Sequence, residues 1–164
     1  MQILITGTPG VGKTTLSKAL SKVLQYKHID ISDYIESNGL YSHKDKKFNS
    51  FIFDVDEIHK NLMRKLDPRK SYIIDTHAPD ILDDPDFIII LRASNSILYQ
   101  RYVDRGYDQT KITENISAEI NGTIEDECDE YFPYTPKMII NLEEKSIDLA
   151  VKEIIDKIDK ISKN

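Results

Sequence analysis

A glycine-rich segment near the N-terminus carries the residues best suited to chemistry. Residues 7–14 read GTPGVGKT and satisfy the pattern G-x-x-x-x-G-K-[ST], the phosphate-binding loop or P-loop. Its glycines leave the backbone N–H groups free to surround a polyphosphate, and the following helix adds its positive end. Lys13 would reach the β- and γ-phosphates, and the Thr14 hydroxyl would ligate Mg²⁺. An apolar run precedes the motif and an amphipathic pattern follows it, so we predict nucleotide binding.

A carboxylate and an imidazole follow a second apolar run. The segment SYIID ends at Asp75, where a P-loop protein needs an acidic group to hold the water shell of Mg²⁺; the alternative is that Asp75 only caps the next turn. His77 could orient a water or sense the γ-phosphate, or it could simply hydrogen-bond to a loop. The histidines at 28, 43 and 59 lack metal-ligand spacing. We therefore predict surface or packing roles for them and no transition-metal site.

Two arginines near the middle of the chain could neutralise the negative charge on a phosphoryl group during its transfer. Arg101 and Arg105 are four residues apart at the end of a predicted helix, so they share one face. Gly106 ends this helix, and residues 107–111 follow it. We therefore predict a short lid whose arginines move onto the nucleotide. The alternative is a solvated arginine pair. The acidic run at 125–130 is interpreted as a solvated helix face, with docking of a basic partner as the other reading.

Short apolar runs alternate with helical patterns along the whole chain, and this order predicts the fold. We expect a mobile polar loop at 41–49 and a cap at Ser32 or Asp33 for the short helix that ends near Gly39. The runs at 71–75 and 87–91 are continuously apolar, which is the pattern of strands covered on both faces of a parallel sheet. We predict one α/β domain over 1–164 with a doubly wound, five-stranded parallel sheet. The expected strands are 2–6, 27–31, 71–75, 87–91 and 137–141, and the longer helices are 12–24, 54–66, 94–104, 108–130 and 145–161.

Composition and charge narrow the class of protein. The 164 residues are 40% hydrophobic and 30% charged, which is typical of a globular domain and excludes a disordered tail or a disulfide scaffold. The single cysteine favours a reducing compartment, so we expect a cytoplasmic location, or a nuclear one if the source is eukaryotic. The net charge of −6 argues against broad contact with DNA or RNA. No apolar stretch approaches the roughly 20 residues of a membrane span, and no signal peptide is expected.

These motifs together resemble a known family. Residues 5–16 (ITGTPGVGKTTL) resemble the P-loop of nucleoside monophosphate (NMP) kinases. The segments LR at 91–92, LYQRYVDRGY at 98–107 and NISAEI at 115–120, with Asp-x-His at 75–77, narrow the match to the adenylate kinase isoenzyme 6 family. The resemblance covers nearly the whole chain. It implies a P-loop NTPase fold of the NMP kinase type, with an NMP-binding segment at about 30–53 and a short lid at about 104–114.

The resemblance also implies an activity and its residues. Members transfer a phosphoryl group from Mg-ATP to AMP to give two ADP, often with broad nucleotide tolerance, and they hydrolyse ATP. They are associated with maturation of the small ribosomal subunit and bind a basic ribosomal protein of that subunit. Carried over by position, the catalytic residues are Lys13, Asp75, His77 and Arg105, and the metal residues are Thr14 and Asp75. The implied ATP-binding residues are Gly10, Gly12, Lys13, Thr14, Thr15, Arg101 and Arg105, and the implied NMP-binding residue is Asp33.

The chain departs from ordinary adenylate kinases on the acceptor side. The segments SDYIE at 32–36 and THAP at 76–79 lack the two arginines that grip AMP in those enzymes. Their loss would cost a few kcal/mol unless other cations replace them; the candidates are Lys44, Lys46, Lys47 and Arg64. Two further readings therefore stay open. One is an ATPase-type assembly factor with little AMP turnover, and the other is a kinase for a different small acceptor.

Overall fold

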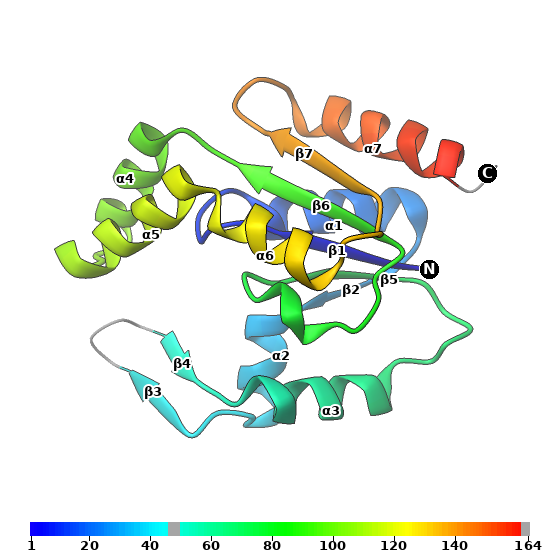
Figure 1. Ribbon diagram of the computed structural model, residues 1–164, viewed down its shortest axis with the longest axis horizontal. Coiled ribbons are helices and arrows are strands. Elements are labelled where there is room, and N and C mark those ends of the chain that lie inside the picture. Colours follow the sequence, from blue (N-terminus) through cyan, green and yellow to red (C-terminus); the bar gives the residue numbers. More distant parts are fainter. Residues whose placement is uncertain (46–49, 162–164) are drawn as a thin grey trace.

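Five parallel strands form the central sheet of the protein (Figure 1). The computed structural model describes residues 1–45 and 50–161. The strand order is β2-β5-β1-β6-β7, so β1 lies at the centre with β5 and β6 on either side. This arrangement confirms the predicted doubly wound sheet. The strands are β1 (Gln2–Thr6), β2 (Lys27–Asp30), β5 (Tyr72–Asp75), β6 (Phe87–Arg92) and β7 (Lys137–Asn141).

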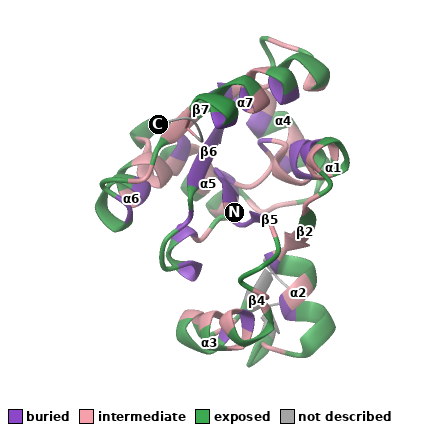
Figure 2. Cartoon of the chain, turned by 90° about the vertical axis from the view of Figure 1, so that its right-hand side faces the viewer, coloured by how far each residue is buried: buried purple, intermediate pink, exposed green. Residues whose placement is uncertain are grey.

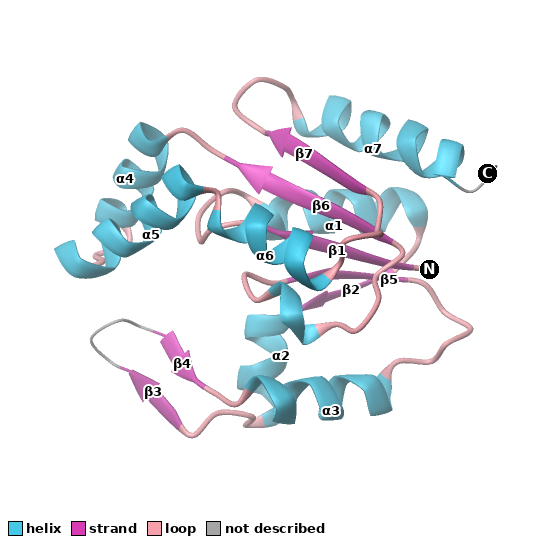
Figure 3. Cartoon of the chain, viewed as in Figure 1, coloured by secondary structure: helices cyan, strands magenta, loops and turns pink. Residues whose placement is uncertain are grey.

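Helices cover both faces of the sheet, as Figure 3 shows. On one face the core includes side chains from α1 (Lys13–Leu24), α4 (Asn95–Asp104), α5 (Gln109–Asn121) and α7 (Ile147–Ile161). On the other face it includes side chains from α2 (Ile31–Asn38), α3 (Val55–Lys65), the short 3₁₀ helix η1 (Pro79–Ile81) and α6 (Thr123–Tyr131). A sheet enclosed in this way has apolar residues at successive positions, because neighbouring side chains point to opposite layers.

The central strand illustrates this alternation. Ile3 and Ile5 pack into the layer with α1 and α7, whereas Leu4 between them packs into the layer with α2 and α3. All three side chains are fully buried, and Figure 2 shows the buried residues along the strands between the helical layers. At about 25 cal/mol per Å² of apolar surface, this burial on two faces provides the main stabilisation of the sheet. The rigid sheet in turn fixes the loops that follow its strands.

The structure corrects three local predictions. Asp30, not Ser32 or Asp33, caps α2, and its Oδ1 accepts hydrogen bonds from two backbone N–H groups of the first turn. The predicted helix at 108–130 is two helices, because Gly122 adopts a φ of +67° and ends α5 before α6 begins. A left-handed backbone conformation of this kind is typical of a helix C-terminus.

The predicted loop at 41–49 is also wrong in part. Strands β3 (His43–Asp45) and β4 (Ser50–Ile52) pair as an antiparallel hairpin, with His43 opposite Ile52. Residues 46–49 of that prediction lie outside the described part of the chain. Among the described helices, none is both long and apolar enough to cross a membrane.

Candidate functional site

The loop between β1 and α1 has a backbone that only glycine accommodates easily. Gly7 has a φ of +142°, and a Cβ built on it would lie 2.4 Å from the carbonyl oxygen of Leu91. Gly12 has a φ of +106° and is the N-cap residue of α1. Because Gly12 has no side chain to satisfy the N–H groups of the first helical turn, those donors remain available to an anion. The local sequence thus builds a phosphate site.

Lys13 lies folded along this loop. Its Nζ donates to the carbonyl oxygens of Gly7 at 2.8 Å and Thr8 at 3.1 Å. The loss of surrounding water lowers the pKa of Lys13 to about 8, although the carboxylates of Asp75 and Asp30 oppose that effect. The ammonium group is therefore held beside the loop by weak neutral acceptors, which a phosphate oxygen can replace.

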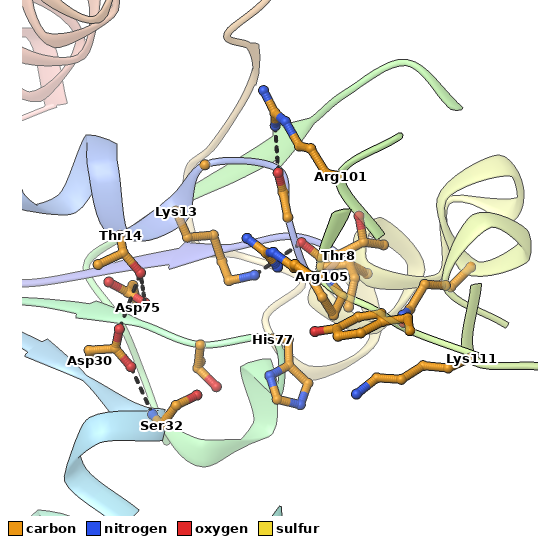
Figure 4. A pocket seen from close by; sticks show the side chains of 18 of the residues that line it. Thr8, Lys13, Thr14, Asp30, Ser32, Asp75, His77, Arg101, Arg105 and Lys111 are labelled. Atoms are coloured by element: carbon orange, nitrogen blue, oxygen red, sulfur yellow. Dashed lines mark hydrogen bonds between the residues drawn. The ribbon is translucent and has the colours of Figure 1, made fainter. Parts of the chain in front are cut away.

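Two carboxylates meet the Thr14 hydroxyl at the carboxyl ends of β2 and β5 (Figure 4). Thr14 Oγ1 lies 3.1 Å from Asp30 Oδ2 and 3.5 Å from Asp75 Oδ1. Asp30 and Asp75 are opposite each other in the pairing of β2 with β5. All three groups offer oxygen atoms, the ligands that Mg²⁺ prefers. The residues therefore fit a Mg²⁺ ion whose remaining ligands are water and phosphate.

His28 fixes the second oxygen of Asp75. Its Nε2 lies 2.6 Å from Asp75 Oδ2, and both side chains are largely shielded from solvent. The surface role offered for His28 is therefore wrong, whereas the packing role stands and includes a hydrogen bond to Asp75. A hydrogen bond to the outer oxygen of a carboxylate orients that group, and such support commonly matters for metal affinity. One oxygen of Asp75 is held by His28 and the other faces Thr14.

Helix α4 contacts the loop from the other side. Arg101 Nη1 donates to the carbonyl oxygen of Gly10, and the Tyr102 hydroxyl donates to that of Pro9, both at 2.5 Å. One turn further along, the guanidinium of Arg105 lies 3.8 Å from the point where a Cβ on Gly10 would stand. Burial raises the pKa of Tyr102 to about 12, so this hydroxyl keeps its proton and donates at neutral pH. Both arginines line the same pocket as the loop.

His77 projects into the middle of this pocket, between the loop and α5 (Figure 4). The loss of surrounding water and the positive charges of Lys13 and Lys111 lower the pKa of His77 to about 4. The imidazole is therefore neutral near pH 7, so it can exchange hydrogen bonds with a water or a phosphate oxygen but adds no charge. Lys111, in the first turn of α5, also lines the pocket, and its Nζ lies 4.0 Å from the ring centroid of Tyr107.

The pocket has a volume of about 900 Å³, at the upper end of the range for small-molecule sites. The structure brings nearly all of the predicted site residues to it. Asp33 does not line it: this side chain is exposed on α2, and Asp30 and Ser32 line the pocket instead. Arg64 is exposed and does not line it either. Predicted residues that do line the pocket are Gly10, Gly12, Lys13, Thr14, Thr15, Asp75, His77, Arg101 and Arg105.

The other candidate cations are Lys44, Lys46 and Lys47. Lys46 and Lys47 lie outside the described residues, as does the side chain of Lys44. Among the described residues that line the pocket, the lysines and arginines are Lys13, Arg101, Arg105 and Lys111. None of these four comes from the segment between β2 and α3.

Sequence reasoning missed a buried ionic network behind the loop. Glu119 on α5 is 3% exposed, and its Oε2 accepts from the Thr8 hydroxyl at 2.7 Å. Its Oε1 accepts from Arg92 Nε at 2.7 Å and from the backbone N–H of Ala93 at 3.1 Å. The network ties the loop, the end of β6 and α5 together. A glutamate within an otherwise amphipathic helix gives no local signal of such a role.

Comparison with known proteins finds relatives among the adenylate kinases. The model of the AAA domain family matches residues 3–122. The adenylate kinase isoenzyme 6 homolog of Saccharomyces cerevisiae is 32% identical over 155 residues, which cover 93% of this chain and 77% of that protein. A relative in Methanocaldococcus jannaschii, whose name assigns it provisionally to the adenylate kinases, is 42% identical over 120 residues, covering 73% of this chain and 67% of its own.

Solved structures share the fold. A deoxyadenosine kinase from M. mycoides superimposes with a TM-score of 0.67 at 20% identity, covering 98% of this chain and all of that one. Shikimate kinase from Bacteroides thetaiotaomicron gives a TM-score of 0.61 at 17% identity, covering 97% of this chain and 98% of that one. At these identities the likeness concerns the arrangement of the sheet and helices.

Proposed function

Because this chain belongs to the adenylate kinase isoenzyme 6 family of P-loop proteins, we propose that it is an adenylate kinase-type phosphotransferase. It transfers the γ-phosphoryl group of Mg-ATP to the phosphate of AMP and releases two ADP. One observation carries the proposal: Lys13, Arg105 and the Thr14–Asp75 pair line a single pocket around a glycine-rich loop. That set of charges matches the needs of phosphoryl transfer, in which catalysis is mainly positioning and electrostatic stabilisation.

Each group has a role in this reaction. Lys13 leaves the carbonyl oxygens of Gly7 and Thr8 and binds the β- and γ-phosphates, while the N–H groups at the start of α1 bind the chain of phosphates. Arg105 neutralises charge on the moving phosphoryl group. Thr14 and Asp75 would hold Mg²⁺, which supplies charge neutralisation between the β- and γ-phosphates when bound.

The proposal includes the two accessory segments of an NMP kinase, one for the acceptor and one that forms a lid. We assign residues 30–53 to acceptor binding and residues 104–114 to the lid. The lid segment comprises the end of α4, the turn at Gly106 and the start of α5. Closure of this lid would exclude water and bring Arg105 and Lys111 onto the phosphates. Broad tolerance among nucleotides and a cytoplasmic location belong to the same proposal.

A second candidate function has one specific observation in its favour. On the acceptor side the described pocket lining includes no arginine, since Arg101 and Arg105 both come from α4 beside the loop. An AMP phosphate would therefore be held weakly. This favours an ATPase whose nucleotide state governs binding of a basic protein of the small ribosomal subunit during ribosome maturation. In that case His77 would orient the attacking water.

The test is the formation of ADP from Mg-ATP with and without AMP, resolved by chromatography together with free phosphate. Rapid ADP formation only with AMP, at nearly two ADP per ATP consumed, supports the kinase. Slow ADP formation with equal free phosphate, unchanged by AMP, supports the ATPase. Lys13→Ala should abolish either activity, whereas Lys18→Ala, on the exposed side of the same helix, should retain it. Turnover by Lys13→Ala at the wild-type rate would refute the site.

A further inference from the structure

Two tyrosine rings and a lysine form a stack between the phosphate-binding loop and α5. Tyr102, which is fully buried on α4, donates its hydroxyl to the carbonyl oxygen of Pro9 at 2.5 Å. The ring of Tyr107 lies parallel to that of Tyr102, with 5.5 Å between the centroids and 11° between the planes. The Nζ of Lys111 lies 4.0 Å from the centroid of the Tyr107 ring. The loop, α4 and the first turn of α5 are therefore in contact through one column of side chains.

The turn at Gly106 brings these three side chains together. Gly106 has a φ of +70°, which a residue with a Cβ rarely adopts. After this turn the backbone N–H of Tyr107 donates to the carbonyl oxygen of Tyr102 at 3.0 Å. Asp108 then begins α5, because its Oδ1 accepts from the backbone N–H of Lys111 at 2.8 Å. Lys111 is thereby fixed in the first helical turn, four residues after Tyr107.

The ammonium group of Lys111 faces the phosphate end of the pocket. Both Tyr107 and Lys111 line the pocket, and in Figure 4 the end of the Lys111 side chain points toward His77. The positive charges of Lys13 and Lys111 both act on His77 and lower its pKa, so ammonium groups from α1 and from α5 approach the same imidazole. The first turn of α5 adds the positive end of a helix dipole. This position suits a group that neutralises phosphate charge.

A ring beneath an ammonium group restricts where that group can lie. A lysine side chain is a flexible four-carbon stem, and it loses rotamer freedom when its ammonium group binds a ligand. Attraction to the negative face of an aromatic ring removes part of that freedom in the free protein. Preorganisation of this kind lowers the barrier of a reaction, because less order has to be imposed in the transition state. Tyr107 thus affects the rate without touching a phosphate.

We propose that Tyr107 is a positioning residue for phosphoryl transfer: its ring, held through Tyr102 against the loop, aims Lys111 at the γ-phosphoryl group. This inference rests on the proposed kinase function. In the transfer, the bond between the γ-phosphorus and the β–γ bridging oxygen breaks, and a bond from that phosphorus to an oxygen of the acceptor phosphate forms. Lys111 offsets charge on the moving group and neither gains nor loses a proton. Lys111 contacts the phosphates, and Tyr107 acts only through Lys111.

A double-mutant cycle on Tyr107 and Lys111 tests this assignment. Both kcat and KM for ATP are measured at saturating AMP for wild type, Tyr107→Leu, Lys111→Met and the double variant, with rates normalised to the folded fraction from circular dichroism. Lys111→Met should lower kcat about 100-fold, and Tyr107→Leu about tenfold, with KM for ATP within about threefold in both. In the Lys111→Met background, Tyr107→Leu should change kcat by less than about twofold, because no cation is left to position.

Conservative and control variants separate positioning from packing. Tyr107→Phe keeps the ring and should restore most of the rate that Tyr107→Leu loses. Tyr99→Leu removes an exposed aromatic ring of α4 that lies outside the pocket lining, and it should keep the wild-type kcat. In proton NMR spectra, the ring should shift the ε-methylene signal of Lys111 upfield in wild type and in Tyr107→Phe, but not in Tyr107→Leu.

The outcomes distinguish this inference from the kinase function. Equal losses from Tyr107→Leu in the wild-type and Lys111→Met backgrounds show that the ring acts by packing alone, and they overturn the inference. A wild-type kcat in Lys111→Met overturns it as well, and so does a Tyr107→Phe variant as slow as Tyr107→Leu. These results leave the kinase function standing. Absence of ADP formation from Mg-ATP and AMP with the wild type overturns the kinase function, and this inference with it.

Discussion

The buried carboxylate of Glu119 should be the most costly single side chain to remove near the site. Glu119→Ala deletes the acceptor for the Thr8 hydroxyl at 2.7 Å, for Arg92 Nε at 2.7 Å and for the N–H of Ala93 at 3.1 Å. These donors come from the P-loop, the end of β6 and the segment after it. One substitution thus leaves three donors without an acceptor at the place where the loop meets the sheet.

The magnitude follows from how far water can replace the lost acceptor. Thr8 is 2% exposed and Ala93 is 8% exposed, so neither donor regains a full hydrogen bond, and each costs about 1–3 kcal/mol. The Arg92 side chain is 30% exposed and keeps its bond to Glu125, so its guanidinium is partly rehydrated. We expect Glu119→Ala to lower the free energy of unfolding by about 3–5 kcal/mol. That is a large part of the roughly 5–15 kcal/mol of a typical domain.

Urea unfolding followed by circular dichroism measures this loss directly. Glu125→Ala is the matched control, because it removes the other acidic partner of Arg92. The side chain of Glu125 is 28% exposed, so its removal should lower the free energy of unfolding by about 1 kcal/mol. Glu119→Gln should fall between the two, since its amide oxygen can still accept and its nitrogen can donate to the Thr8 hydroxyl. If Glu119→Ala and Glu125→Ala were equally stable, the reasoning from burial would be refuted.

Three further predictions concern the loop and its carboxylates. Because the pKa of free-enzyme Lys13 is about 8, kcat/KM for ATP should fall about tenfold per pH unit above pH 8 as the ammonium loses its proton; a flat profile between pH 7 and 9.5 would contradict this. Gly7→Ala should lower the free energy of unfolding by more than about 3 kcal/mol, since its Cβ would lie 2.4 Å from a carbonyl oxygen. Gly39 has a φ of +65° and open space around it, so Gly39→Ala should lower it by only about 1 kcal/mol in the same urea experiment. His28→Ala should reduce kcat about 10-fold or more and raise the Mg²⁺ concentration needed for half-maximal rate, because Asp75 loses the group 2.6 Å from its Oδ2; an unchanged Mg²⁺ dependence would show that His28 has no such role.

The sequence alone was sufficient to predict the layered fold. The five strands and most of the helices follow from local patterns, because continuous apolar runs and the spacing of three and four residues depend only on the chain itself. Local breaks were harder to predict. Gly122 divides one long amphipathic pattern into α5 and α6, and a single glycine in such a pattern is compatible with either outcome.

The phosphate-binding part of the site was equally accessible, since the P-loop is one contiguous segment whose backbone and following helix build the site by themselves. Lys13 and Thr14 are read directly from that motif, and Asp75 from its place at the end of an apolar strand. Arg101 and Arg105 were predicted from their spacing on one helix face, and the resemblance to a family then assigned them to ATP. All five side chains line the same pocket.

Only the tertiary structure brought the remaining groups together. Asp30 stands beside Asp75 because β2 pairs with β5, and strand order within a sheet is not encoded in either strand. His28, on the same strand as Asp30, contacts Asp75 across a separation of 47 residues. Glu119 contacts Thr8 across 111 residues. Patterns along the chain indicate which side chains are polar and which element carries them. Which polar side chains meet depends on the packing of whole elements, and that packing is decided by the buried apolar surface of the entire domain.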